Sequence, residues 1–258
     1  MDLKLKDKLY VVTGATSGFG KAITEKLIAE NAKVIINARG EEKLIAFKKE
    51  HPQQMEILKG DITSDAAISA MINLIGDRDL SGLVINAGGP PTMSFLETDL
   101  TDWDQAYKSI LRWKVNLAQQ VIPLFQANKY GRMVFIESCS VKQPVKNLVL
   151  SNSLRLAVVG FVKTLSHEVA DSGIAMNILA PGYHATPAMD RLFQKKSEVQ
   201  GITKAAAKEA FEREIPVGQM GKAEDLASLA VWLLSEDSRY ITGQTISVDG
   251  GLIKGVFS

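Results

Sequence analysis

The glycine-rich segment 13–20 constrains the fold of this chain more than any other part of its sequence. A run of β-branched and aromatic residues precedes it and residues 21–30 have helical composition, which predicts a strand, a tight turn and a helix. The glycines let the backbone approach a phosphate closely, and the helix N-terminus offers free N–H groups to a pyrophosphate. Such glycines also mark ordinary loops. The residues predicted to form a dinucleotide site are Thr13, Gly14, Ser17, Gly18, Phe19 and Gly20.

A second apolar run, 33–38, ends where a dinucleotide site reads the adenosine ribose, about 20 residues after the turn. An NAD site would place an acid there, whereas this chain has Ala38 and Arg39. A guanidinium suits a 2′-phosphate through forked, charge-assisted hydrogen bonds. The sequence therefore predicts NADP (NADPH) as cofactor. The alternative is that Arg39 is a solvated charge at the start of the next helix.

Strand-like runs alternate with helical ones along the whole chain. This alternation predicts an α/β fold with a doubly wound, parallel, seven-stranded sheet and helices on both faces, in a single domain over residues 1–258. The runs are 8–13, 33–38, 55–58, 82–86, 132–138, 174–180 and 245–248. Several are continuously apolar, as expected for strands covered on both faces.

Residues 186–221 interrupt the alternation and are predicted to form two charged amphipathic helices, around 189–193 and 205–214. Ligands bind beyond the carboxyl ends of the strands in such sheets, so we expect this segment to cover the substrate. Its apolar residues either line the pocket or pack the two helices down. They are Met189, Leu192, Phe193, Ile202 and Phe211.

Composition limits the partners. The chain has 258 residues, 30 basic and 29 acidic, with a net charge of +1, which gives no field to attract nucleic acid or an anionic membrane. No stretch approaches the ~18 apolar residues of a membrane span, and the first residues lack the apolar core of a signal peptide, so we expect a cytoplasmic protein. No metal site is predicted. Cys139 is the only cysteine and is interpreted as a packing residue or a thiol in a site wall.

Further motifs make the chain resemble the short-chain dehydrogenase/reductase family, most closely its ketoacyl-carrier-protein reductase branch. These motifs are Gly60-Asp61, 86–89, 131–136, Pro181-Gly182 with Thr186, 241–244 and 248–251. The resemblance implies a Rossmann fold, a homodimer or homotetramer, and a cofactor site. In that site Asp61 and Ile62 would approach the adenine, Asn86, Ala87 and Gly88 would back the cofactor, and Pro181, Gly182 and Thr186 would hold the nicotinamide end. From the residues alone, Asp61 is also a helix cap and Asn86 a turn residue.

Members of this family act through an Asn, a Ser, a Tyr and a Lys. Ser138 matches the serine, but Ser151 and Arg155 stand at the Tyr and Lys positions and Ile110 at the Asn position. Asn116 lies too far along the same predicted helix to substitute directly. The chain is thus similar to a divergent subgroup that lacks the Tyr-x-x-x-Lys pair.

These substitutions change the available proton chemistry. A serine hydroxyl is a much weaker acid than a phenol and a guanidinium keeps its proton, so Ser151 is a poor general acid. One helical turn still puts Ser151 and Arg155 on one face, where they are predicted to bind ribose, phosphate or a substrate anion. The alternative is a helix-start serine and a surface charge. The opposite, buried face is predicted to carry Leu150, Leu154, Ala157, Phe161 and Leu165.

The sequence favours an NADP(H)-dependent oxidoreductase that interconverts a carbonyl and an alcohol, with Ser138, Ser151 and Arg155 as catalytic residues. The proton donor is left open among Lys142, Tyr183, His184 and water. The alternatives are an NADP-binding protein without redox turnover, acting as a sensor or structural partner, and nonredox chemistry in the same crevice.

Overall fold

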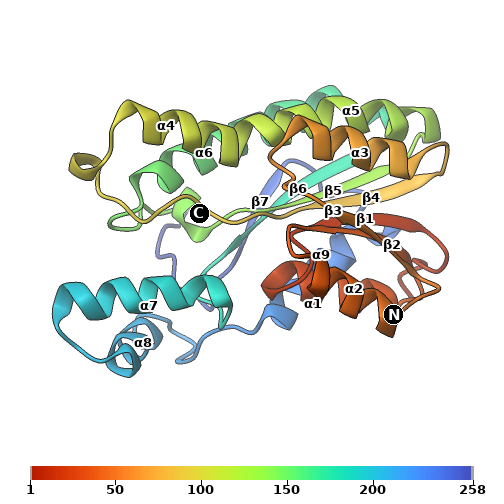
Figure 1. Ribbon diagram of the computed structural model, residues 1–258. Coiled ribbons are helices and arrows are strands. Elements are labelled where there is room, and N and C mark those ends of the chain that lie inside the picture. Colours follow the sequence, from red (N-terminus) through yellow and green to blue (C-terminus); the bar gives the residue numbers. More distant parts are fainter. Residues whose placement is uncertain (1, 257–258) are drawn as a thin grey trace.

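Seven parallel strands form a single sheet at the centre of the molecule, as predicted (Figure 1). The computed structural model describes residues 2–256, apart from the side chain of Ala188. The strands are β1 (Leu9–Thr13), β2 (Lys33–Ala38), β3 (Met55–Lys59), β4 (Leu80–Ile85), β5 (Gly131–Ile136), β6 (Ile174–Pro181) and β7 (Gln244–Val248). Their order in the sheet is β3-β2-β1-β4-β5-β6-β7. The order reverses between β1 and β4, which is where such sheets bind ligands.

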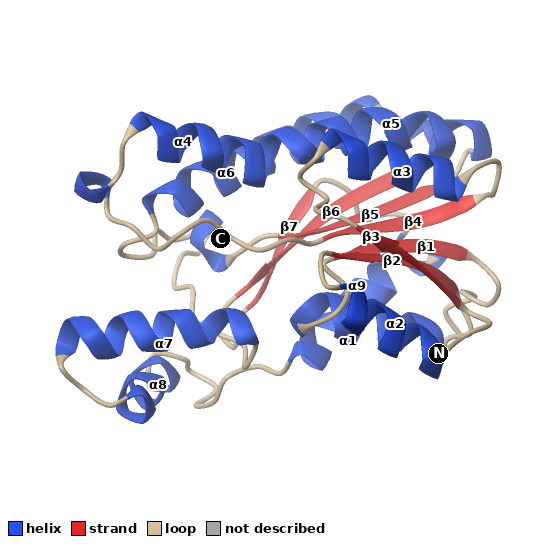
Figure 2. Ribbon diagram, viewed as in Figure 1, coloured by secondary structure: helices blue, strands red, loops and turns tan. Residues whose placement is uncertain are grey.

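Helices cover both faces of the sheet (Figure 2). One layer consists of α1 (Gly18–Ala29), α2 (Glu41–Glu50) and α9 (Ala223–Leu233), and the other of α3 (Asp65–Ile75), α4 (Leu100–Tyr107), α5 (Trp113–Asn128) and α6 (Val149–Glu168). Each layer packs an apolar core against the sheet, and β1, β4, β5 and β6 are buried along their whole length. Continuous apolar strands are the sequence signature of this two-sided burial.

The junction between α4 and α5 is a π-helical turn, Lys108–Arg112. Ile110, in this turn, is buried in the core, and Trp113 donates its indole N–H to the carbonyl of Ser109 at 2.9 Å. A π-turn inserts one residue into the helical repeat and so changes which side chains face inward. Lys114, the second residue after the turn, is buried and only 3% exposed.

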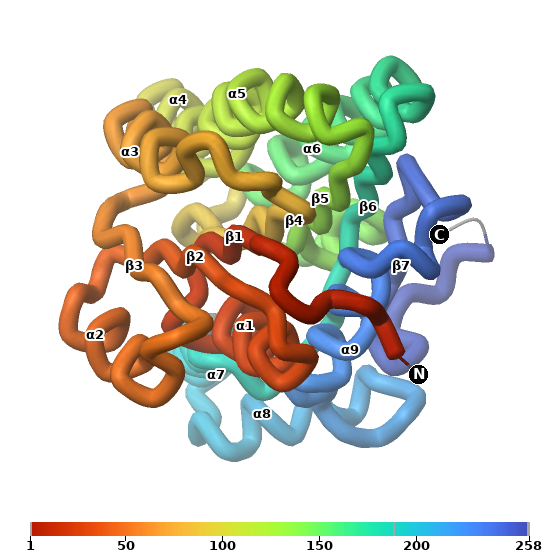
Figure 3. Tube along the Cα trace, turned by 90° about the vertical axis from the view of Figure 1, so that its right-hand side faces the viewer, coloured from red at the N-terminus to blue at the C-terminus, as the bar shows by residue number. Residues whose placement is uncertain are grey.

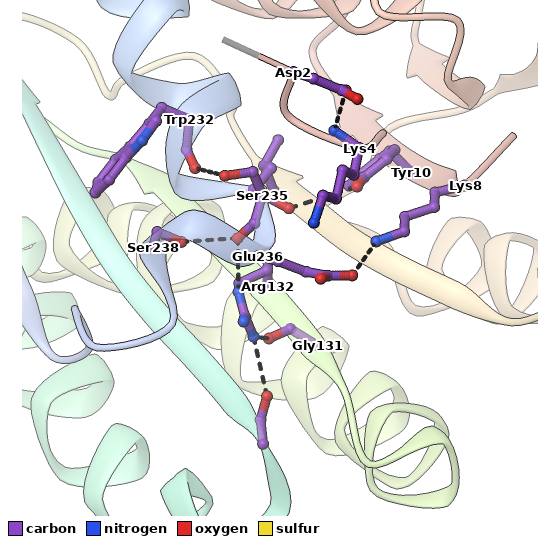
Figure 4. Close-up of polar contacts among 12 residues, drawn as sticks. Asp2, Lys4, Lys8, Tyr10, Gly131, Arg132, Trp232, Ser235, Glu236 and Ser238 are labelled. Atoms are coloured by element: carbon purple, nitrogen blue, oxygen red, sulfur yellow. Dashed lines mark hydrogen bonds and ion pairs between the residues drawn. The ribbon is translucent and has the colours of Figure 1, made fainter. Parts of the chain in front are cut away.

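At the amino-terminal end of β5, Arg132 connects this strand to neighbouring segments of the chain (Figure 4). Its guanidinium donates to the carbonyls of Gly131, Gly173 and Ser235 at 2.9, 3.0 and 3.1 Å. Nε and Nη1 of this buried charge thus have acceptors from three segments of the chain. Beneath the sheet, α1 and α9 lie side by side (Figure 3).

The predicted insertion forms α7 (Pro187–Gln200) and α8 (Lys204–Glu212), which extend beyond the carboxyl ends of the strands (Figure 1). The five apolar residues predicted there pack with one another in a small separate core around Ala207 and Met220. None of the five lines the large cleft described below. The structure therefore favours the interpretation that they pack the two helices down.

Candidate active site

A cleft of about 1200 Å³ runs along the carboxyl ends of β1, β2, β4 and β5. It brings together most of the predicted cofactor residues, namely Gly14, Ser17, Gly18, Phe19, Arg39, Asp61, Ile62, Asn86, Ala87, Gly88 and Thr186. Thr13, Gly20, Pro181 and Gly182 lie outside its lining. Thr13 and Gly20 contact residues of the lining, whereas Gly182 contacts Val248 and Asp249 outside it.

The glycine-rich turn is tied to β4 by Thr13 and Asn86. The buried hydroxyl of Thr13 donates to the carbonyl of Asn86 and accepts from its N–H, each at 2.8 Å. Gly14 has φ +60°, and a Cβ on it would lie 2.8 Å from the Asn86 carbonyl oxygen. A Cβ on Gly20 would lie 2.2 Å from the carbonyl oxygen of Gly14. Both positions require glycine, and the turn places the N-terminus of α1 at the cleft.

The far end of the cleft is formed where β2 and β3 end. Arg39 is exposed, lines the cleft and makes no ion pair with any described residue. Asp61 also lines it, and its carboxylate accepts from the N–H and the hydroxyl of Thr63 at 3.0 and 2.8 Å. Ser64 is the N-cap of α3, so Asp61 orders the turn before the helix rather than capping it.

Across the glycine turn, Thr186 closes the cleft beside Gly18, with its Cγ2 3.7 Å from a Cβ placed there. The N–H of Gly182 donates to the carbonyl of Val248 at 2.9 Å, and a Cβ on Gly182 would lie 2.7 Å from the Cβ of Asp249. His184 is buried with its ring edge-on to Phe19 at 5.0 Å, and burial lowers the pKa of this imidazole.

Ser151 and Arg155 lie together on α6, and the Arg155 Nε donates to the Ser151 hydroxyl at 3.1 Å. Both are buried, so the alternative of an exposed surface charge is wrong. The predicted burial pattern of the helix is also wrong in part, because Ala157 is exposed and the inward face carries Ser151 and Arg155 with valines 158 and 162. Two buried, charged side chains from outside α6 explain why this polar face turns inward.

Those charges are Lys114 and Glu137, which the sequence analysis missed. The Glu137 carboxylate receives Lys114 Nζ on one oxygen and Arg155 Nη1, at 2.8 Å, on the other. The Glu137 side chain is 0% exposed, that of Lys114 4% and that of Arg155 10%. Glu137 and Arg155 line the inner end of the cleft. Glu137 interrupts an apolar strand end directly before Ser138, which is the sequence signal that points to it.

Ser138 itself is half-buried after β5, and its hydroxyl accepts from the N–H of Ser140 at 3.1 Å. It does not line the cleft. The adjacent Cys139 is buried, and burial raises the pKa of its thiol to about 11, so it stays protonated. This agrees with a packing role.

The proposed alternative proton donors lie elsewhere. None of Lys142, Tyr183 and His184 lines the large cleft. Tyr183 and His184 border a separate hollow of about 210 Å³, and the Tyr183 hydroxyl donates to Glu214 at 3.3 Å. Burial raises the pKa of Tyr183. Burial also lowers the pKa of Lys114; the nearby Arg155 charge lowers it further, whereas the Glu137 carboxylate raises it.

Residues 2–256 contain no cluster of three or more His, Cys, Asp and Glu side chains able to hold a metal ion. No helix in this part of the chain is both long and apolar enough to cross a membrane.

A parallel sheet whose order reverses beside a glycine-rich turn defines a dinucleotide-binding α/β protein of the Rossmann type. A family model described as enoyl-(acyl carrier protein) reductase matches residues 14–253. The chain belongs to the short-chain dehydrogenase/reductase family.

Similar proteins cover nearly the whole chain. The 3-oxoacyl-acyl-carrier-protein reductase FabG of Aquifex aeolicus is 29% identical over 98% of this chain and 100% of its own. The NADPH-dependent reductase BacG of Bacillus subtilis is 28% identical over 95% and 97%. The crystal structure of L-sorbose reductase from Gluconobacter frateurii, complexed with NADPH and L-sorbose, matches with a TM-score of 0.92 at 25% identity, covering 99% and 100%.

Proposed function

We propose that the protein is an NADP(H)-dependent oxidoreductase that interconverts a carbonyl and an alcohol. The observation that carries the proposal is the single cleft that joins the glycine turn and Arg39 at one end to Arg155 at the other. The named relatives include NADPH-dependent reductases, and one of them is known with NADPH and a sugar bound.

The residues of the outer cleft fit a dinucleotide. A Cβ on Gly14 or Gly20 would clash with the carbonyl oxygen of Asn86 or Gly14, so glycine is what allows the tight turn, and the N-terminus of α1 carries no acidic residue in its first turn. The pyrophosphate would lie at that helix end, and the unpaired guanidinium of Arg39 would hold the 2′-phosphate. Asp61 and Ile62 would flank the adenine, and Thr186 the nicotinamide end. The bound cofactor supplies the hydride.

We assign catalytic roles to Ser138, Ser151 and Arg155, of which Arg155 lines the inner end of the cleft and the two serines do not. The Ser151 oxygen accepts from Arg155, so its own hydrogen is available to a substrate oxygen. The Arg155 charge would stabilise the negative charge that grows on that oxygen. Because neither residue is a suitable general acid, water would supply the proton. We also propose that residues 186–221 cover the substrate, since Thr186, Pro187 and Arg191 border the cleft.

Single-turnover measurements test this function. Protein saturated with NADPH is mixed with a panel of ketones, aldehydes and oxo acids, and loss of nicotinamide absorbance is followed. We expect reduction of at least one class and a slower rate for Arg155→Ala, with Arg112→Gln, whose exposed partner is Asp65, as the unaffected control. NADPH binding without turnover of any carbonyl would contradict the proposal.

The absence of a phenol at the inner end favours a second function, that of an NADP-binding protein without redox turnover. The double variant Ser151→Tyr/Arg155→Lys separates the two. Activity that appears only in the double variant would support the binding protein, whereas activity lost in it would support a specialised enzyme.

We further propose a homodimer or homotetramer that uses α6, α9 and β7. Leu156 on α6 is 53% exposed, which is consistent with a face covered by another copy. Light scattering across a concentration series would give the mass, and a monomer at every concentration would exclude the proposal.

A further inference from the structure

The inner end of the cleft has two basic side chains and only one carboxylate. Lys114 and Arg155 share the single carboxylate of Glu137, and all three side chains are nearly or completely buried. When Lys114 is protonated, the group carries one uncompensated positive charge. An unpaired charge in a protein interior is costly, so an anion that reaches this place is strongly favoured.

The free hydrogen-bonding positions there are donors. Arg155 uses Nε on Ser151 and Nη1 on Glu137, while its Nη2 has no partner among the described residues. Nη2 lies against Gly89 in the cleft wall, 3.2 Å from where a Cβ on that glycine would be. Ser151 also keeps its hydroxyl hydrogen, but it is buried and does not line the cleft. Both oxygens of Glu137 face cations, so the site offers hydrogens to an acceptor.

We propose that this end of the cleft is an anion subsite, in which the free Nη2 of Arg155 holds the carboxylate of a small oxo acid while its carbonyl is reduced. The inference deepens the proposed oxidoreductase function and rests on it. Lys114 and Glu137 are positioning residues: Glu137 orients the guanidinium, and Lys114 takes up half of the Glu137 charge so that Arg155 is not neutralised. The carboxylate keeps its bonds, as hydride reaches the carbonyl carbon and a proton from water reaches the oxygen.

The subsite gains a pH dependence from Lys114. The charged groups that face Lys114 are Glu137 after β5 and Arg155 on α6. An anion on Arg155 favours the protonated form of Lys114, and by linkage the protonated lysine favours the anion. Burial lowers the pKa of Lys114. Anion affinity is therefore highest below that pKa and declines as the pH rises through it.

A calorimetric titration of NADPH-saturated protein tests the subsite. The probes are 3-hydroxybutyrate and its methyl ester, which share a carbon skeleton, differ in charge and are not reduced by NADPH. We expect wild type to prefer the acid by about tenfold, the scale of one charge-assisted hydrogen bond, and to lose this preference as the pH rises. Arg155→Ala should abolish the preference, while Arg112→Gln should retain it.

Two variants of the positioning residues should shift the preference in opposite directions. Lys114→Met leaves Arg155 neutralised by Glu137 and should lower it. Glu137→Gln frees Arg155 of its counter-ion and should raise it. A purely structural role would make both variants lower it by loosening the site, and that result would overturn the inference. Circular dichroism shows whether each variant folds. The preference of the wild-type protein for the acid over the ester, and its pH profile, test the anion subsite without any variant.

Measurements without cofactor separate this inference from the proposed function. If the free protein prefers the acid and the NADPH complex does not, the cofactor occupies Arg155 and the substrate subsite is wrong. If NADPH fails to bind but the acid preference and its opposite shifts persist, the oxidoreductase proposal fails and the anion site stands. An equal affinity for acid and ester in every state overturns the subsite.

Discussion

The two ends of the cleft differ in the groups that form them. The outer end is mostly backbone: a glycine turn, a helix N-terminus and two strand ends, with exposed charges such as Arg39 at the rim. The inner end is a group of buried charged side chains, Lys114, Glu137 and Arg155, from α5, the end of β5 and α6. Backbone shape restricts which residues are tolerated at each position, whereas a buried charge requires a partner of opposite sign. The chemistry of the inner end can therefore change while the outer end and the fold remain.

The largest effect should come from removing the shared carboxylate. Glu137→Leu leaves the Lys114 and Arg155 charges buried without a counter-ion, which costs about 3–5 kcal/mol of unfolding free energy. Urea unfolding measures the loss. Glu56→Gln, which removes an exposed partner of Arg78, is the control and should cost at most about 1 kcal/mol. Equal losses in the two variants would show that the inner end does not depend on a buried charge group.

At the outer end, Gly20→Ala places a Cβ in the space of the Gly14 carbonyl oxygen. It should lower the unfolding free energy by about 1–3 kcal/mol and also weaken NADPH binding. The control is Gly160→Ala, on the exposed side of α6 with no atom within 4 Å of its Cβ, which should stabilise the helix by up to about 1 kcal/mol. Thermal unfolding with and without NADPH reports both effects. An unchanged Gly20→Ala protein would argue against a backbone-defined outer end.

The exposed rim charge should affect cofactor choice and leave stability unchanged. Arg39→Asp removes the predicted partner of the 2′-phosphate and should lower the NADPH-to-NADH affinity ratio by about 10- to 100-fold. Arg239→Asp, exposed and outside the cleft, is the charge-matched control. If the ratio stays the same in Arg39→Asp, the assignment of Arg39 is wrong.

The smallest effect concerns the support behind the outer end. Burial lowers the pKa of His184 from 6.5 in the folded protein, so below that pH the unfolded chain binds a proton that the folded protein excludes. The stability contributed by neutral His184 is present above pH 6.5 and declines as the pH falls towards its folded pKa. His184→Gln should flatten this decline by less than about 1.4 kcal/mol per pH unit, measured by urea unfolding between pH 7 and 5. An unchanged slope would show that another group controls it.

The sheet, its parallel strands and the outer end of the cleft could be predicted from the sequence because each depends on local signals. Apolar runs mark the strands, and Gly14 and Gly20 mark backbone positions where a side chain would clash. Boundaries moved by one or two residues, as at β4, which begins at Leu80 rather than residue 82.

The inner end was only half predicted. Ser151 and Arg155 were paired correctly on one face of α6, yet that face is buried rather than free, because its counter-charge comes from Glu137 and Lys114 far away in the sequence. No local pattern links these positions, and the π-turn before Lys114 shifts the helical repeat that would have predicted its direction. Long-range charge balance is a tertiary property.

The most direct test of the proposed cofactor site is a titration of wild-type protein with NADPH and NADH, followed by energy transfer from Trp103, Trp113 and Trp232 to the reduced nicotinamide. We predict saturable binding of NADPH that is at least about tenfold tighter than that of NADH, the scale of one charge-assisted contact. A preference for NADH, or no binding of either, would contradict it.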